Sequence, residues 1–219
     1  MRVCLASTSP ARLALLRQSG IEPLTLSPEV DEEEVARAAE ERHGSALAPA
    51  ELVLLLGRAK AADVAARLRR EDPAFEGIIV GGDSMFALDG KVYGKPHTPE
   101  EATRRWAEMR GRTGVLHSGH SVHLLRPGAE PTEVHAVAEA TVSFAADVSD
   151  EEIRAYVSSG EPLHVAGAFT VDSLGGAFIE RVEGDPSTVV GMSLSTLRHM
   201  VGELGIRWTD LWAPRGRAS

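Results

Sequence analysis

The sequence predicts an α/β protein with a mixed β-sheet, because three patterns occur together. Short apolar runs at residues 2–6 and 77–83 are typical of buried strands. Longer segments between such runs, residues 49–70 above all, carry apolar residues at helical spacing. Two further strand-like segments, 114–126 and 133–145, follow one another across a short turn, which favours an antiparallel pair.

The first half of the chain begins with a strand at 2–6 and a helix at 9–20, which has Pro10 near its start and Gly20 at its end. Asp89 and Gly90 are typical turn residues of a hairpin within 84–96. The other elements expected here are an extended segment at 21–30 leading to the acidic residues 31–41, a loop at 43–49, a helix at 49–70 and a strand at 77–83.

The second half begins with a helix at 98–111, where Thr98 and Glu101 have the spacing of a capping box. The remaining elements expected are strands at 114–126 and 133–145, a capped helix at 149–160, a pair of short strands at 166–173 and 177–184, one long helix at 186–205 and a frayed tail at 213–219.

Composition bounds the class of protein. The 219 residues can bury one sizeable core, as a single domain or as two closely joined lobes. The net charge is −9 and no block of Lys and Arg stands out, so we expect no nucleic-acid partner. Cys4 has no second cysteine to pair with, and no apolar run approaches the roughly 18 residues of a membrane span. The chain is therefore expected to be cytoplasmic, with no membrane association.

The first candidate site is the junction between the strand at 2–6 and the helix that follows. Ser7, Thr8 and Ser9 offer hydroxyl groups beside a helix N-terminus, and Arg12 offers a guanidinium suited to phosphate. The alternative is a capped helix with a surface arginine.

Acidic and basic residues elsewhere extend this candidate. Asp83 follows an apolar strand and two glycines, which suits a metal ligand or a general base but also a turn cap. Lys95 lies in the tight turn "GKP", and Lys60 lies in an apolar helix, where it either extends to solvent or reaches an anionic pocket. A carboxylate of the cluster 31–34 could join Asp83 around a divalent cation, or the cluster could simply be a solvated helix start.

Other chemistries fit less well. The three histidines of "HSGHSVH" cannot converge on a metal in regular β geometry, because His117 and His123 share one face and His120 lies on the other. The chain has neither a Gly-x-Ser-x-Gly elbow nor a glycine-rich Walker loop.

The chain resembles the Maf family, the nucleoside triphosphate pyrophosphatases also called septum formation proteins, over about residues 3–205. The motifs that carry the resemblance occur in the family's order: "LASTSPARLALL", "VDE", "RAKA", "GGDS…LDG…GKP", "SDEEIRAYVSSGEP", "AGAF" and "GDPSTVVGMSL". The resemblance implies one domain over 1–219, an elongated structure of two lobes around a long mixed sheet, with the substrate in a central cleft.

The resemblance also implies a reaction, in which a nucleoside triphosphate and water give the monophosphate and pyrophosphate with the help of Mg²⁺ or Mn²⁺. By motif position, Asp83 would be the catalytic base, and Glu32 and Asp83 would hold the metal. The triphosphate would be held by Ser7, Arg12, Lys60 and Lys95. A homodimer is common among relatives, and the rival interpretation is a non-catalytic nucleotide-binding regulator of cell division.

Three positions depart from the family's pyrimidine-selective pattern. Ala11 stands where many members have an arginine, Ser84 where many have threonine, and Asp172 where many have glutamine. The segment 164–175 instead resembles the branch that prefers 7-methyl-GTP. A carboxylate at 172 suits the donors of guanine, so a purine or modified purine is the expected substrate.

Overall fold

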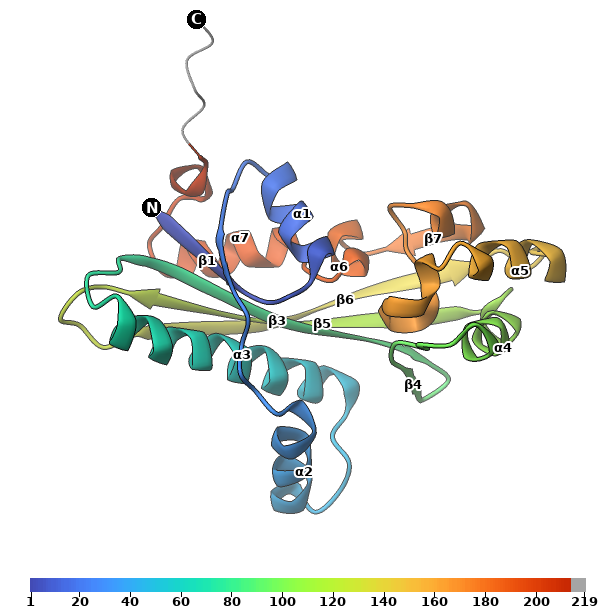
Figure 1. Ribbon diagram of the computed structural model, residues 1–219, viewed down its shortest axis with the longest axis horizontal. Helices are drawn as coiled ribbons and strands as arrows, with labels where there is room; N and C mark the ends of the chain where they lie inside the picture. The colour runs from blue at the N-terminus through green and yellow to red at the C-terminus, as the bar shows by residue number, and fades with distance from the viewer. Residues whose placement is uncertain (214–219) are drawn as a thin grey trace, which may run out of the picture. The chain divides into compact units, whose positions relative to one another are not determined.

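The computed structural model describes residues 1–213, so that the predicted tail at 213–219 lies, apart from Ala213, outside the described residues. Strands and helices are interspersed along the chain (Figure 1). Within residues 1–213 the strands form one seven-stranded sheet in the order β2-β1-β3-β5-β6-β7, with β4 paired to β3. The sheet contains parallel and antiparallel pairs, which confirms the predicted α/β fold with a mixed sheet.

The elements are bounded as follows. The strands are β1 (Arg2–Ala6), β2 (Leu24–Leu26), β3 (Gly77–Leu88), β4 (Lys91–Tyr93), β5 (Thr113–Leu125), β6 (Thr132–Phe144) and β7 (Ile179–Glu183). The α-helices are α1 (Pro10–Gln18), α2 (Glu32–His43), α3 (Pro49–Glu71), α4 (Pro99–Met109), α5 (Asp150–Ser158), α6 (Pro186–Val190) and α7 (Leu194–Glu203). The 3-10 helices are η1 (Glu161–His164), η2 (Ala166–Ala168), η3 (Leu174–Phe178) and η4 (Trp208–Leu211). None of these helices is both long and apolar enough to cross a membrane.

The described chain divides into two compact units. Unit 1 comprises residues 1–83, 119–137 and those from 194 onward, and unit 2 comprises 84–118 and 138–193. The strands β3, β5 and β6 each contribute residues to both units.

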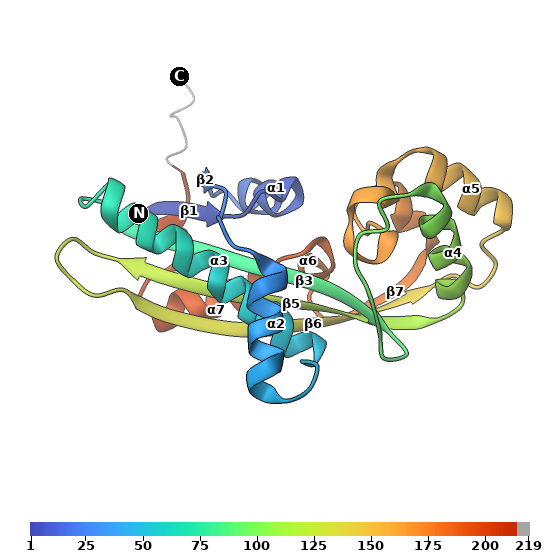
Figure 2. The same ribbon diagram turned by 60° about the horizontal axis from the view of Figure 1, so that its bottom comes forward.

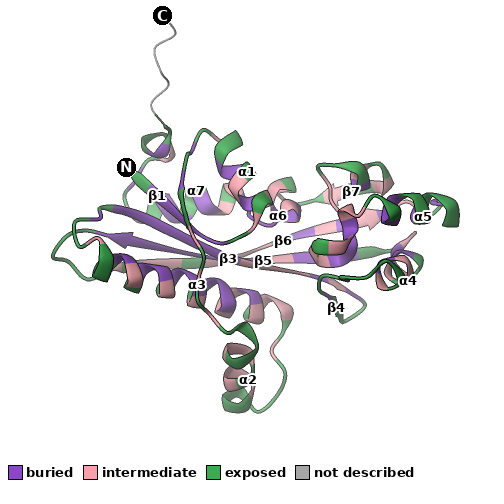
Figure 3. Cartoon of the chain, viewed as in Figure 1, coloured by how far each residue is buried: buried purple, intermediate pink, exposed green. Residues whose placement is uncertain are grey.

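Unit 1 is built on parallel strands. β1 pairs in parallel with β2 and with β3, so that Cys4 lies opposite Leu24 on one side and Ile79 on the other. Strands buried on both faces read as continuous apolar runs, which is why "RVCLA" and "GIIV" were recognisable in the sequence. Figure 3 shows the burial of these strands.

Unit 2 is held by an aromatic core. β3 turns into β4 through Asp89 (φ 48°) and Gly90 (φ 76°), which confirms the predicted hairpin. Phe86 of β3 packs edge-to-face on Phe144 and Phe169, with ring centroids 5.8 and 5.0 Å apart. These rings form one buried cluster with residues of α4 and α5.

Three expectations about the elements were wrong. β3 does not end at Asp83 but continues to Leu88, because Phe86 and Leu88 keep burying their side chains beyond it. Residues 166–173 do not form a strand, since Gly167 (φ 75°) and Ala168 (φ 62°) adopt left-handed conformations. The expected long helix at 186–205 is broken at Gly191 (φ 118°) into α6 and α7.

Candidate active site

The start of α1 shows how the serine-rich junction is built. The Ser9 side chain is the N-cap of α1 and accepts a hydrogen bond from the Arg12 amide at 3.4 Å. The Ser7 hydroxyl accepts from the Ser9 amide at 3.1 Å and from Arg12 Nη1 at 3.4 Å. The capping interpretation is thus confirmed for Ser9, and Ser7 orients the guanidinium of Arg12, which is itself buried. A phosphate contact for Ser7 and Arg12 stays a prediction.

Close packing of α3 on the strands of unit 1 decides where Lys60 lies (Figure 2). A Cβ atom on Gly81 would lie 2.6 Å from the Gly57 carbonyl oxygen and 2.7 Å from Ala61 Cβ. A Cβ on Gly119 of β5 would lie 2.3 Å from the Val53 carbonyl oxygen. The helix backbone can approach this closely only where the strand residue has no side chain. Gly81 of "GGD" is therefore needed for helix packing.

The centre of the candidate site is the ammonium group of Lys60. Its Nζ atom lies 2.7 Å from Asp83 Oδ1 and 2.8 Å from Glu32 Oε1. The side chains of Lys60 and Asp83 are 9% and 13% exposed, while that of Glu32 is 51% exposed. Of the two roles left open for Lys60, extension to solvent is therefore wrong, and the residue lies against two carboxylates. Glu32 is available because Asp31 caps α2, which makes Glu32 the first residue of that helix.

Arg12 completes a group of two cations and two carboxylates. A Cβ on Gly82 would lie 3.8 Å from Arg12 Nε, so the guanidinium passes over the backbone next to Asp83. Burial lowers the pKa of Arg12, and the negative charges of Asp83 and Glu32 act in the opposite direction. Arg12 still carries its charge, because arginine starts from a pKa far above neutrality.

The two carboxylates fit a divalent cation. Asp83 and Glu32 already direct oxygen atoms toward one positive charge, the ammonium of Lys60. Magnesium commonly takes one or two protein carboxylates and completes its shell with water and phosphate oxygens. Residues 1–213 contain no group of three or more His, Cys, Asp or Glu side chains arranged for a metal, so a closed all-protein site is not present in the described chain.

Ser84 and Asp172, two of the predicted specificity residues, belong to unit 2, whereas the group around Lys60 belongs to unit 1. The Ser84 hydroxyl lies 3.0 Å from Ser118 Oγ and 3.1 Å from the Gly191 carbonyl oxygen, so its hydrogen-bonding capacity is largely used within the protein. Asp172 is exposed, and among residues 1–213 it makes no hydrogen bond or ion pair. The remaining predicted specificity residue, Ala11, is half-buried on α1 in unit 1.

Lys95 is exposed on a loop whose backbone is fixed at both sides. Arg105 Nη1 donates to the carbonyl oxygen of Gly94, and the His97 amide donates to the Leu163 carbonyl oxygen at 3.0 Å. His97 adopts a left-handed conformation with φ 63°. The tight turn expected at "GKP" is not found: residues 94–97 form a loop, and the Lys95 side chain lies at the surface of unit 2.

The histidines have separate partners, as far as the described chain extends. His117 Nδ1 lies 3.0 Å from Glu139 Oε1, and His123 Nε2 lies 3.9 Å from Glu133 Oε1. Burial lowers the pKa of His123. His117 is thus hydrogen-bonded to Glu139, whereas the distance from His123 Nε2 to Glu133 is too long for a hydrogen bond.

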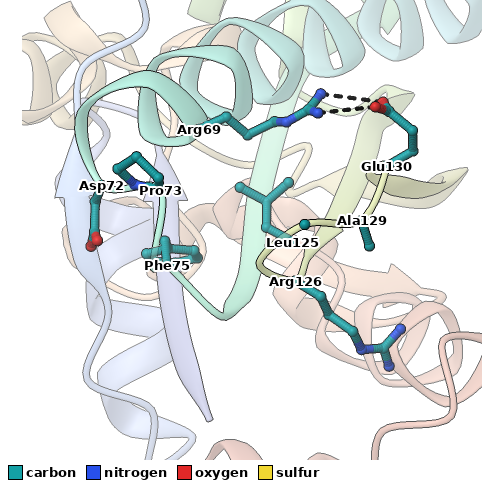
Figure 4. Close-up of a pocket in the computed structure, with 9 residues that line it drawn as sticks. Arg69, Asp72, Pro73, Phe75, Leu125, Arg126, Ala129 and Glu130 are labelled. Atoms are coloured by element: carbon teal, nitrogen blue, oxygen red, sulfur yellow. Dashed lines mark hydrogen bonds and ion pairs between the residues drawn. The ribbon is translucent and has the colours of Figure 1, made fainter.

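A shallow pocket of about 260 Å³ lies elsewhere in unit 1, at the C-terminal end of α3 (Figure 4). An ion pair between Arg69 and Glu130, 3.1 Å long, borders the pocket. None of the predicted site residues lines it. It therefore has no part in the candidate site.

Sequence reasoning missed Glu161, although it stands in the quoted segment "SDEEIRAYVSSGEP". Its carboxylate accepts hydrogen bonds from several residues of the segment 170–175, which includes Asp172. The available signal was an acidic residue followed within fifteen positions by Thr, Ser and two glycines. That signal is weak, because such residues are also typical of ordinary turns.

Comparison with known proteins now places the chain. The model of the family described as "Maf-like protein" matches residues 2–204. Over 216 residues the chain is 59% identical to a protein of Leifsonia xyli named "Nucleoside triphosphate pyrophosphatase", and 99% of each chain is covered. A protein of Nocardia farcinica with the same name is 49% identical over 95% of each chain. The chain belongs to the Maf family.

One solved structure, a nucleoside-triphosphatase/dITP/XTP pyrophosphatase from Mycobacterium abscessus, matches 68% of this chain and 77% of its own at 16% identity. The TM-score is 0.32, which is too low to support an inference about function.

Proposed function

We propose that this chain hydrolyses nucleoside triphosphates to nucleoside monophosphates and pyrophosphate. Membership of the Maf family and the names of its relatives support this activity. The observation that carries the proposal is the contact of Lys60 with both Asp83 and Glu32, beside the buried guanidinium of Arg12. Buried charges at this density are costly for stability alone, and they are typical of sites that handle charged groups.

Each residue has a chemical role in this proposal. Asp83 takes the proton of a water molecule whose oxygen bonds to one of the two phosphorus atoms beside the oxygen that bridges the α- and β-phosphates, and the bond from that phosphorus to the bridging oxygen breaks, which releases the monophosphate and pyrophosphate. Arg12, Lys60 and Lys95 neutralise the phosphate oxygens, and the Ser7 hydroxyl both orients Arg12 and donates to phosphate. A bound Mg²⁺ or Mn²⁺ would be held by Asp83 and Glu32 and would supply positive charge to the phosphate oxygens.

The charges of the resting site explain why a divalent cation is expected. Arg12 and Lys60 balance Asp83 and Glu32, so the formal charge of the four side chains is 2 − 2 = 0. A triphosphate carries several negative charges, and these four side chains add no net positive charge to meet them, so that Lys95 alone of the proposed phosphate-binding cations lies outside this balance. A divalent cation that binds together with the nucleotide supplies the missing positive charge. Lys60 can then contact phosphate oxygens in addition to the two carboxylates.

The test is release of pyrophosphate from a panel of canonical and methylated nucleoside triphosphates. We expect turnover with Mg²⁺ or Mn²⁺ and a loss of about a hundredfold or more when EDTA removes the metal, because the triphosphate charge is then unmet. Tight nucleotide binding without any turnover would instead support the alternative function, a non-catalytic regulator of cell division. That alternative draws on the family's second name, septum formation protein, and on Val165, which stands where many family members have a lysine.

For the substrate, we propose a guanine-type purine, 7-methyl-GTP included, over dTTP and UTP. An ionised Asp172 is acceptor-only and suits the paired donors of guanine, whereas the oxygen acceptors of uracil and thymine oppose it. Asp172 is exposed and has no partner among residues 1–213, which leaves its carboxylate available to a ligand. Ala11 and Ser84 would act with it by lacking the arginine and the threonine methyl group of pyrimidine-selective members.

Asp172→Gln is expected to lower kcat/KM for GTP relative to UTP by about tenfold or more, since one mismatched polar contact costs about 1–3 kcal/mol. The measurement is the ratio of the two kcat/KM values. Asp147→Gln, at another exposed acidic position of unit 2, is the matched control and should leave the ratio unchanged. An unchanged ratio in a correctly folded Asp172→Gln variant would remove the basis for a purine preference.

The cellular setting belongs to the same proposal. A single cysteine, Cys4, and the absence of a membrane-spanning helix among residues 1–213 agree with a cytoplasmic enzyme that acts on free nucleotides. A homodimer is expected from the resemblance to other family members.

A further inference from the structure

The carboxylate of Glu161 is the centre of a hydrogen-bond cluster in unit 2. It lies at the start of η1, after Gly160, which has φ 79°. Five donors reach its two oxygen atoms: Tyr156 Oη (3.0 Å), Thr170 Oγ1, Ser173 Oγ (2.7 Å), the Leu174 amide (3.2 Å) and the Gly175 amide (3.1 Å). Four of these five donors belong to one short segment, 170–175.

The segment 170–175 is folded tightly around this carboxylate. A Cβ atom on Gly175 would lie 2.5 Å from Tyr156 Oη and 2.7 Å from the Thr170 carbonyl oxygen, so only glycine allows the turn to close. Upstream, Trp106 Nε1 donates to the Ala168 carbonyl oxygen at 2.7 Å. Residues 170–175 contain no helix or strand before Leu174, so these contacts, rather than a backbone ladder, set their conformation.

Asp172 is held by its neighbours and makes no such contacts itself. Thr170 and Ser173, on either side of it, donate to the same carboxylate. Asp172 is exposed between them and has no hydrogen bond among residues 1–213. The backbone that carries Asp172 is therefore fixed by Glu161, while its side chain is left for another group.

The ionised form of Glu161 is the form that matches its surroundings. Burial acts to raise the pKa, but hydrogen bonds from Thr170, Ser173, Gly175 and Tyr156 outweigh it and lower the pKa to about 2. A carboxylate only accepts hydrogen bonds, and all five neighbours donate. An amide at this position would turn an NH₂ group toward at least two of those donors.

We propose that Glu161 is a positioning residue for base recognition, which holds the segment 170–175 so that Asp172 meets the base of the nucleotide. This inference rests on the proposed function in one respect, the role of Asp172 as the group that selects the base. The inference adds Glu161 to the residues that determine selectivity, although Glu161 itself makes no contact with the substrate. Glu161 would set selectivity through Asp172 and leave the phosphate-binding residues of unit 1 unaffected.

Binding measurements with non-hydrolysable nucleotides test the proposal without any need for turnover. The probes are α,β-methylene GTP, α,β-methylene UTP and inorganic tripolyphosphate, each titrated with Mg²⁺ into the full chain by calorimetry. In Glu161→Gln we expect the affinity for the GTP analogue to fall about tenfold, while the affinities for the UTP analogue and tripolyphosphate change by roughly twofold or less. Glu152→Gln, a capping carboxylate of α5 that contacts Ser149, is the matched control and should bind all three probes like the wild type.

A double variant separates positioning from a general effect on stability. If Glu161 acts through Asp172, adding Glu161→Gln to Asp172→Gln changes the GTP-to-UTP affinity ratio by no more than roughly twofold, because coupled residues are not additive. Should Glu161→Gln not fold, Ser173→Ala removes one donor of the cluster and should produce a smaller change of the same ratio. Hydrogen exchange at amides 170–175 is expected to accelerate in either variant.

The contrary outcomes are distinct. If Glu161→Gln weakens the affinity for all three probes equally, Glu161 contributes to stability alone. An unchanged GTP-to-UTP affinity ratio in a folded Glu161→Gln chain would overturn the inference. So would a wild-type chain that does not prefer the GTP analogue. Selective binding by a wild-type chain that releases no pyrophosphate would contradict the proposed hydrolysis and leave the role of Glu161 standing.

Discussion

Replacement of Asp83 by Asn is expected to lower the rate of pyrophosphate release by about a hundredfold or more while the fold stays intact. General-base catalysis commonly contributes 10²- to 10⁴-fold, and an amide cannot take up the proton of the attacking water. The amide is nearly the same size and keeps an oxygen atom that can accept from Lys60 Nζ, now 2.7 Å from Asp83 Oδ1. The loss should therefore appear in kcat, with little change in melting temperature.

Asp63→Asn provides the matched control for this experiment. Asp63 lies on α3 in the same unit, and its carboxylate accepts a hydrogen bond from the Glu29 amide at 2.9 Å. Asp83→Asn and Asp63→Asn each remove one negative charge. They differ because only the Asp83 carboxylate contacts Lys60. If Asp83→Asn retains most of the wild-type rate, Asp83 is not the catalytic base.

Alanine at Arg12, Lys60 or Lys95 is expected to reduce kcat/KM by more than tenfold at each position. A charge-assisted hydrogen bond contributes about 1.5–3 kcal/mol, which corresponds to roughly ten- to a hundredfold in rate or affinity. Arg12 and Lys60 are buried, so no neighbouring solvent can replace the lost charge. Lys60→Ala should also lower the free energy of unfolding, because Asp83 loses its contact with the ammonium group.

Arg17→Ala is the control for these three variants. Arg17 lies on α1 with Arg12, but its guanidinium is exposed and pairs with Glu22 at 2.7 Å. Surface ion pairs of this kind contribute little, so activity and stability should both stay close to those of the wild type. Small and equal effects at all four positions would show that Arg12, Lys60 and Lys95 do not hold the triphosphate.

Most of the fold could be predicted because local signals agreed with the tertiary structure. Ser149 and Glu152 form the capping box of α5, and Asp89-Gly90 forms the turn of the β3–β4 hairpin. The errors fell where tertiary contacts decided the conformation. Gly191 ends α6 in a left-handed conformation that a helical apolar pattern does not reveal. The sequence of 166–173 is typical of a strand, but hydrogen bonds to Trp106 and Glu161 set its conformation instead.

The candidate site was predictable as a set of residues and less so as an arrangement. Motif order pointed to Lys60, Asp83 and Glu32, but their spacing in the sequence could not show that one ammonium group would contact both carboxylates. Glu161 was not identified because its importance lies in contacts with a segment about ten residues away, and a single glutamate after a helix carries no such information.

The close approach of α3 to the strands of unit 1 has a consequence for how the motif "GGD" is interpreted. Gly81 is excluded from carrying a side chain by the backbone of Gly57, and Asp83, two residues later, contacts Lys60 of the same helix. With the catalytic role proposed for Asp83, variants at Gly81 and at Asp83 would be eliminated by selection for unrelated reasons, lost packing in one case and lost chemistry in the other. Two independent pressures act on three adjacent positions, so intolerance to substitution within this motif does not by itself identify the residue that meets the substrate.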